Sequence, residues 1–330
     1  MISWERVPSG SMTSDTMRLP RGLICPLVTP LKTEDVLDVA TLERLIGHAG
    51  MGADALLVGD VFWGEGLVLD PDTRTEMASA ALEIVQGKWP VLITITSDTS
   101  KATLGLTAAI ESFIERSGYS GRVFWVDYPL YYHSNRGLPQ FYETLVRDTS
   151  IPIIVGNHPK LIQRHKTRLE HKNIRTSVLK KLSGINRIQG IIFIGPLGRS
   201  INYHKALRHR RGFKFYDGDE AAFMKQPSSD GVVAAGSNLL PRAWHEIAWS
   251  CLNRYDVQRQ YADHVNQMWE TGVMVQEFYD LYAKNPAGVL KRMLHVAGIL
   301  PTAHTASGTR TTDRAQNRAV EAICRQYDLI

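Results

Sequence analysis

Eight short apolar segments, separated by longer helical patterns, constrain the fold of this chain more than any other feature. The segments are rich in β-branched residues, and most follow one another at intervals of roughly 20 to 40 residues. We expect strands over GLICPLV (22–28), ADALLVG (53–59), PVLITIT (90–96), RVFWVDY (122–128), IPIIVG (151–156), IQGIIFIG (188–195), GFKFYDG (212–218) and GVVAAG (231–236).

The stretches between these segments have the pattern of amphipathic helices. TLERLIGHAG (41–50) places three apolar residues on one face before a glycine, and TRTEMASAALEIVQG (73–87) also ends at a glycine. Apolar strands covered on both faces by helices favour a parallel sheet. We therefore predict an α/β fold, a (β/α)8 TIM barrel. An open doubly wound sheet is the alternative, but no GxGxxG motif follows the first strand.

Strand signals end before Pro241, and only helical patterns follow. We expect the first of these to be the last barrel helix and the rest to form a helical appendage, packed on the barrel or on a neighbouring subunit. The predicted organisation is a flexible N-terminal tail over 1–19, the barrel over 20–253 and a C-terminal helical region over 254–330.

Composition narrows the class of protein. The chain has 330 residues, of which 44% are apolar, enough for a large core. Its longest apolar runs are about a third of the ~20 residues that a membrane span needs, and the polar start MISWERVPSG is unlike a secretory signal. We therefore expect no membrane partner and cytoplasmic residence. The three cysteines are widely spaced, which favours neither a disulfide framework nor structural zinc.

Positive charge is concentrated in one block. The net charge is +5, and residues 160–214 contain about fifteen Lys and Arg but only one acid, Glu170. The block has few aromatic residues between its basic ones and no recognition motif, so we expect no nucleic-acid partner. A solvated helical face that helps to attract anionic small molecules is the favoured interpretation.

Several motifs lie where a barrel carries its chemistry, at the carboxyl ends of the strands. GLICPLVTPL, GADALLV with GEGLVLDPDTR, PLYY, and DGDE with SDGVVAAGSNLLP together resemble the dihydrodipicolinate synthase/N-acetylneuraminate lyase family. NPAGVLKRMLHVAGI is similar to that family's helix from Asn-Pro to a lysine, with one extra residue before the lysine. The resemblance covers about residues 21 to 300.

The resemblance implies a barrel with a C-terminal helical region, a dimer or tetramer of identical chains, and lyase chemistry on 2-oxo acids. That chemistry normally uses a Schiff base between pyruvate and a lysine at the end of the sixth strand. The family motif Gly-Ile-Lys-Asp falls on Gly190, Ile191, Ile192 and Phe193, so isoleucine occupies the lysine position. Isoleucine has no amine and cannot form an imine.

Other positions depart from the family pattern as well. The fifth-strand tyrosine, which relays protons in the family, falls on Gly156, although Asn157 and Pro159 are kept. The Gly-Thr-Thr-Gly-Glu loop that binds the pyruvate carboxylate corresponds to GDVFWGE, which has lost both hydroxyls. The arginine five positions after the tyrosine falls on Leu161, next to Lys160.

These departures indicate that the ancestral reaction is lost, and three hypotheses remain. The first is an enzyme with altered chemistry at the same end of the barrel, the mouth formed by the carboxyl ends of the strands. Its candidate catalytic residues are Tyr131, Tyr132, Lys160 and Glu65. The candidate substrate-binding residues are Phe62, Trp63, Gly64, Asn157, His158, Ile192 and Phe193. The second is a non-catalytic ligand-binding or regulatory pseudoenzyme with an apolar pocket. The third is a structural partner of active relatives.

Further polar residues are candidates for the predicted site. Asp60 and His158 add possible acids, bases or anion contacts, and Lys160 is the favoured replacement if the Schiff base has moved. A metal version of the site would use Asp60, Glu65, His158 and Asp217, but these lack metal-ligand spacing, so we expect neither metal nor cofactor. Asp219 and Glu220 align with a motif that we interpret as mainly architectural. The expected ligand is a small molecule, possibly a 2-oxo acid.

Overall fold

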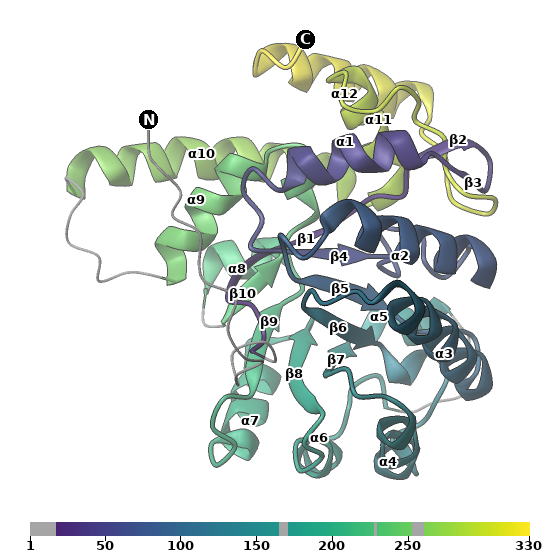
Figure 1. The fold of residues 1–330 in the computed structure, drawn as a ribbon. Helices are drawn as coiled ribbons and strands as arrows, with labels where there is room; N and C mark the ends of the chain where they lie inside the picture. The colour runs from purple at the N-terminus through teal and green to yellow at the C-terminus, as the bar shows by residue number, and fades with distance from the viewer. Residues whose placement is uncertain (1–17, 165–170, 228–229, 253–260) are drawn as a thin grey trace, which may run out of the picture.

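The computed structural model describes residues 18–164, 171–227, 230–252 and 261–330. Most of the predicted N-terminal tail and part of the basic block therefore lie outside the described residues. Eight parallel strands form a closed barrel in the order β1-β10-β9-β8-β7-β6-β5-β4, which confirms the predicted (β/α)8 fold (Figure 1). These strands are β1 (Gly22–Pro26), β4 (Ala55–Val58), β5 (Val91–Thr94), β6 (Val123–Asp127), β7 (Ile153–Asn157), β8 (Ile188–Phe193), β9 (Lys214–Asp217) and β10 (Gly231–Val233).

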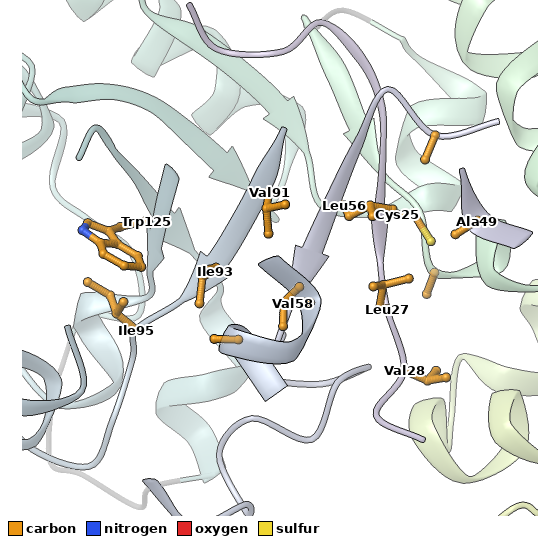
Figure 2. Close-up of a cluster of buried hydrophobic side chains, with 14 of the residues drawn as sticks. Cys25, Leu27, Val28, Ala49, Leu56, Val58, Val91, Ile93, Ile95 and Trp125 are labelled. Atoms are coloured by element: carbon orange, nitrogen blue, oxygen red, sulfur yellow. The ribbon is translucent and has the colours of Figure 1, made fainter. Parts of the chain in front are cut away.

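Alternation along each strand divides the core into two parts. On β5, Val91 and Ile93 belong to the cluster between strands and helices, whereas Leu92 belongs to the cluster inside the barrel. Successive side chains of a strand point to opposite faces, so a continuously apolar segment fills both layers. Figure 2 shows the outer layer, with Cys25 on β1, Leu56 on β4 and Trp125 on β6.

Helices follow the strands and cover the barrel. They are α1 (Val39–Ala49), α2 (Pro71–Val85), α3 (Ser100–Ser117), α4 (Leu138–Asp148), α5 (Pro159–Arg164), α6 (Thr176–Leu182), α7 (Leu197–Leu207) and α8 (Glu220–Lys225). Local signals start them: the Asp70 side chain accepts hydrogen bonds from the backbone N–H groups of Asp72 and Thr73, and Pro71 is the first residue of α2.

Among the described residues, four helices follow the last strand: α9 (Pro241–Leu252), α10 (Tyr261–Tyr282), α11 (Pro286–Val296) and α12 (Arg314–Gln326). Helix α9 packs on β1, and α10 to α12 gather at one side of the barrel (Figure 1). Among the described residues, none of the helices is long and apolar enough to cross a membrane.

Two kinds of short element were not expected from the sequence. Strands β2 (Leu31–Thr33) and β3 (Val36–Leu37) form a small antiparallel hairpin after the first barrel strand. The 3-10 turns η1 (Pro129–Tyr131) and η2 (Ala235–Asn238) follow the fourth and eighth barrel strands. Both turns lie at the end of the barrel where the strands finish, so they shape the loops around the mouth.

Candidate functional site

A cavity of about 420 Å³ opens at the carboxyl ends of the barrel strands. Its walls come from the loops after β4, β6, β7 and β9, from β8 and β10, and from the junction between α10 and α11. The lining residues are Asp60, Phe62, Trp63, Tyr128, His158, Lys160, Ile192, Ile194, Gly218, Asp219, Glu220, Val233, Tyr279, Ala283, Lys284 and Pro286. This is the end of the barrel at which the sequence predicts the site.

Ile192 lies on β8, where its side chain is fully buried. Its backbone is in register with Gly156 on β7 and with Tyr216 on β9. A Cβ atom added to Gly218 would lie 2.9 Å from Cγ2 of Ile192, so the glycine leaves room for the isoleucine. The cavity therefore has a hydrocarbon surface at the position where the resemblance implies an amine.

Asp60 follows β4 and is the most enclosed acid in the loop that carries Phe62 and Trp63. Its Oδ1 accepts hydrogen bonds from the backbone N–H groups of Phe62 and Trp63, both at 2.9 Å. Burial raises the pKa of Asp60, while these N–H groups act in the opposite direction. The carboxyl group is thus oriented by its own loop and lines the cavity.

His158 follows β7 and stands beside two aromatic rings. Its ring centroid is 4.2 Å from that of Phe62 and 6.4 Å from that of Tyr128. The backbone N–H of Lys160 donates to Nδ1 of His158 at 3.2 Å. Because Nδ1 accepts this bond, the neutral imidazole carries its proton on Nε2 and can donate from that atom.

Glu220 is the first residue of α8, and it is buried where it lines the cavity. Its Oε1 accepts from the backbone N–H of Ala235 at 2.5 Å, and its Oε2 accepts from the Tyr282 hydroxyl. Burial raises the pKa of Glu220 to about 7, although the Tyr282 hydroxyl and the backbone N–H groups favour the charged form. Trp63 packs edge-on against Tyr282, with ring centroids 5.5 Å apart.

Lysines stand at the outer edge of the cavity. Lys160 belongs to α5, and Lys284 lies between α10 and α11, so the appendage contributes one of the two. Both side chains are exposed. Two cations at the opening give an anionic ligand a favourable approach.

Five of the predicted site residues meet in this cavity: Phe62, Trp63, His158, Lys160 and Ile192. Glu65 lies elsewhere. Its Oε2 pairs with Nζ of Lys291 on α11, and its Oε1 accepts from the backbone N–H of Ala306 at 2.8 Å. Glu65 thus ties the loop after β4 to the C-terminal region.

Tyr131 and Tyr132 also lie outside the lining of the cavity. The Tyr131 hydroxyl donates to Oδ1 of Asp98 at 3.1 Å, and the Tyr132 hydroxyl donates to Oδ2 of Asp127 at 2.7 Å. Burial and the charge of Asp127 raise the pKa of Tyr132 well above its usual value. The Tyr131 hydroxyl thus links η1 to the loop after β5, whereas the Tyr132 hydroxyl binds the last residue of β6.

The remaining three candidates have structural contacts. Gly64 allows close approach, since an added Cβ would lie 2.7 Å from the backbone N of Asp60. Asn157 is fully buried and holds the chain at Ile174, whose N–H donates to its Oδ1 at 2.9 Å. Phe193 points away from the cavity and packs edge-on against Tyr203, with ring centroids 5.4 Å apart.

Two residues of the cavity have more prominent places than the sequence indicated. Tyr128 was included only as the end of an apolar strand segment, and Glu220 was interpreted as architectural. Only their position in the sequence could have indicated a role at the site. Tyr128 directly follows β6, and Glu220 comes shortly after β9, at the end of the barrel where such sites lie. Among the described residues, no group of three or more His, Cys, Asp or Glu is arranged to hold a metal ion.

The model of the dihydrodipicolinate synthetase family matches residues 19–304. The 4-hydroxy-tetrahydrodipicolinate synthase of Thermotoga neapolitana is 27% identical over 236 residues, which span 69% of this chain and 74% of the relative. The enzyme of the same name from Shewanella frigidimarina is 26% identical over 292 residues, or 86% of this chain and 90% of the relative.

Solved structures share the architecture. Dihydrodipicolinate synthase from Bacteroides thetaiotaomicron superposes with a TM-score of 0.77 at 22% identity, covering 93% of this chain and 98% of the other. A prophage protein of the dihydrodipicolinic acid synthase family from E. coli K12, solved in complex with pyruvate, gives a TM-score of 0.78 at 19% identity and covers 94% of this chain and 99% of the other. At these identities the likeness supports the fold alone.

Proposed function

This chain belongs to the dihydrodipicolinate synthetase family, and we propose that its barrel mouth binds a 2-oxo acid or a related small carboxylate and moves a proton on it without a covalent imine. The observation that carries the proposal is the composition of one cavity. Ile192 forms part of its floor, while Asp60, His158 and Glu220 line the same space. An imine needs an unprotonated amine, whereas proton transfer needs only a positioned acid or base.

The proposed reaction is enolisation, the proton step common to aldol-type chemistry. Asp60 accepts a proton from the carbon next to the ligand's carbonyl group, and the electrons of that C–H bond move to the carbonyl oxygen as an enolate. Burial raises the pKa of Asp60, which makes its carboxylate a stronger base than an exposed one. Return of the proton to carbon completes an exchange with solvent.

Anion contacts would hold the ligand in place. His158 can donate from Nε2, because its Nδ1 already accepts the Lys160 backbone N–H. The side chains of Lys160 and Lys284 offer positive charge at the opening. Phe62 and Trp63 stand where the resemblance implies hydroxyl donors, so the carboxylate contact would move from that loop toward His158 and the lysines.

A non-catalytic binding protein is the second candidate, and a specific observation favours it. Both oxygens of Glu220 are already hydrogen-bonded within the chain, and Oδ1 of Asp60 is bonded to its own loop. With Phe62, Trp63 and Tyr128 nearby, the cavity could serve mainly as an apolar binding pocket. Assembly into dimers or tetramers, cytoplasmic residence and partnership with active relatives stay predictions.

Isotope exchange separates the two candidates. Pyruvate and a panel of 2-oxo acids are incubated with the protein in deuterated buffer, and loss of the C3 proton signal is followed by NMR. We expect exchange above the protein-free rate, and a drop of about 100-fold in Asp60→Asn. Asparagine is the matched change because its Oδ1 can still accept the two loop N–H groups. Binding without exchange would support the pocket interpretation instead.

Borohydride trapping tests the imine directly. We expect intact mass to show no adduct after borohydride treatment with pyruvate, while an active relative treated in parallel is labelled. An adduct mapped to any lysine, Lys160 above all, would contradict the proposal and restore a covalent mechanism with a relocated amine.

A further inference from the structure

The ring of Tyr128 occupies the space above Gly156. A Cβ atom added to Gly156 would lie 2.2 Å from Cδ1 and 2.4 Å from Cε1 of Tyr128, far inside contact distance. The two residues belong to neighbouring strands, since Gly156 lies on β7 and Tyr128 directly follows β6. Any side chain at position 156 would therefore compete with the tyrosine ring for one place.

That place adjoins the cavity floor. Gly156 is in register with Ile192 on the next strand, and both Tyr128 and Ile192 belong to the apolar cluster inside the barrel. Tyr128 is only 4% exposed, yet it lines the cavity. Its ring is thus fixed by packing, with little freedom to turn away from a bound ligand.

The hydroxyl of Tyr128 is chemically available. Its backbone N–H donates to Thr96, but among the described residues its hydroxyl oxygen makes no hydrogen bond. Burial, and next the charge of Asp60, raise the pKa of Tyr128 well above its usual value. The phenol therefore keeps its proton at neutral pH and can act as a donor in a site that also holds the proposed base.

We infer that Tyr128 is a catalytic residue of the mouth, which donates its hydroxyl proton to the ligand oxygen that becomes negative when Asp60 removes the carbon-bound proton. The inference rests on the proposed function and adds the acid to the base. The C–H bond breaks and its electrons form the enolate; Tyr128 protonates the enolate oxygen, and protonated Asp60 returns a proton to the phenolate. The products are an enol, neutral Tyr128 and ionised Asp60, so protons and electrons balance.

The first test is Tyr128→Phe, which removes the hydroxyl and keeps the ring over Gly156. The deuterium exchange of pyruvate is measured together with pyruvate binding by ligand-observed NMR. We expect exchange to fall about 100-fold while the dissociation constant changes by less than about threefold. The matched control is Tyr216→Phe, another tyrosine of the inner cluster, whose hydroxyl donates to the backbone oxygen of Pro20 away from the cavity.

The second test uses the competition for space. Gly156→Ala places a methyl group against the Tyr128 ring and displaces it, so we expect a loss of exchange although every polar group is kept. In the Tyr128→Phe background the same change should reduce exchange no further, because the displaced hydroxyl is already gone. If the losses of exchange caused by Gly156→Ala and Tyr128→Phe added up in the double variant, the inference would be contradicted.

The outcomes also separate this inference from the proposed function. Exchange by the wild-type chain that persists within threefold in Tyr128→Phe would overturn the role of Tyr128 and leave enolisation by Asp60 standing. Binding of pyruvate without exchange in the wild-type chain would overturn both. Loss of exchange in Tyr128→Phe with retained binding would support both.

Discussion

The side chain of Ile192 lies on the cavity floor, where the missing side chain of Gly218 leaves room for it. A lysine in this place would be desolvated, which lowers an amine pKa and favours the neutral nucleophile. Isoleucine keeps the burial and removes the nitrogen. The environment suited to a reactive amine is thus retained around a side chain that cannot react.

Restoring the amine tests this view of the site. In Ile192→Lys we expect the free energy of unfolding at pH 7 to fall by roughly 2 to 4 kcal/mol, because the amine must be buried uncharged or unpaired. We also expect borohydride with pyruvate to label the introduced lysine, as judged by peptide mapping. A folded variant that gives no adduct would show that a ligand carbonyl does not reach this position.

The neighbouring residue provides the control. Ile191 is as buried as Ile192 but faces the outer cluster between strands and helices. Ile191→Lys should lose a similar amount of stability and give no adduct, because its amine points away from the cavity.

At the scale of elements, one buried ion pair joins the mouth to the C-terminal region. The pair joins Glu65, in the loop after β4, to Lys291 on α11. Nζ of Lys291 also donates to the backbone oxygen of His304 at 2.8 Å, and burial lowers the pKa of Lys291 while Glu65 raises it. The arrangement explains why a glutamate that the family resemblance places near the substrate serves in this chain as an anchor for the loop.

A double-mutant cycle on this pair is the element-scale prediction. Lys291→Met leaves a buried carboxylate without its partner, so we expect a loss of about 3 to 5 kcal/mol in the free energy of unfolding, measured by urea denaturation. Adding Glu65→Gln should recover a large part of that loss, because no unpaired charge remains.

Arg292, the next residue of α11, provides the comparison. It pairs with Glu321 at 2.7 Å, but both side chains are partly exposed. Arg292→Ala should therefore cost less than about 1 kcal/mol. A Lys291→Met effect as small as this would contradict the anchoring role of the buried pair.

At the scale of the whole molecule, Glu220 connects three parts of the chain. It starts α8, it accepts from Ala235 in η2, and it accepts from Tyr282 at the end of α10. Its carboxyl group thus links the barrel to the appendage. The protonation of Glu220 is therefore coupled to folding of the whole described molecule rather than to one loop.

This coupling predicts how stability depends on pH. Burial raises the pKa of Glu220 from 4.5 to about 7. Between these values the native state holds a proton that the unfolded state has released, so the free energy of unfolding falls as pH rises, by about 3 kcal/mol in total. Below pH 4.5 and above pH 7, Glu220 contributes no further change.

Glu220→Gln isolates this effect. Glutamine can accept from the Ala235 N–H and donate to the Tyr282 hydroxyl, and it does not titrate. Urea denaturation of both proteins from pH 4 to pH 8 should show the wild-type protein losing about 3 kcal/mol relative to the variant between pH 4.5 and pH 7. Other buried acids, such as Asp60 and Asp127, are present in both proteins and cancel in the difference. If the free energies of unfolding of the two proteins changed in parallel between pH 4.5 and pH 7, the raised pKa of Glu220 would be contradicted.

Local patterns in the sequence were sufficient for the barrel. Each of the eight apolar segments became a barrel strand, because a run such as PVLITIT fills both layers of the core and has few other stable arrangements. The hairpin of β2 and β3 was not anticipated, since its paired segments are two and three residues long and show no periodicity.

The amino-acid sequence by itself determined the eightfold alternation that closes the barrel and the absence of an amine at Ile192, because both are properties of residue type and spacing. Only the tertiary structure decided which polar groups meet at the mouth. Asp60 lines the cavity whereas Glu65, five residues later, is bound to Lys291, and Tyr128 fills the space left by Gly156 from another strand. These outcomes depend on strand register and on contacts between distant segments, so no local pattern contains them.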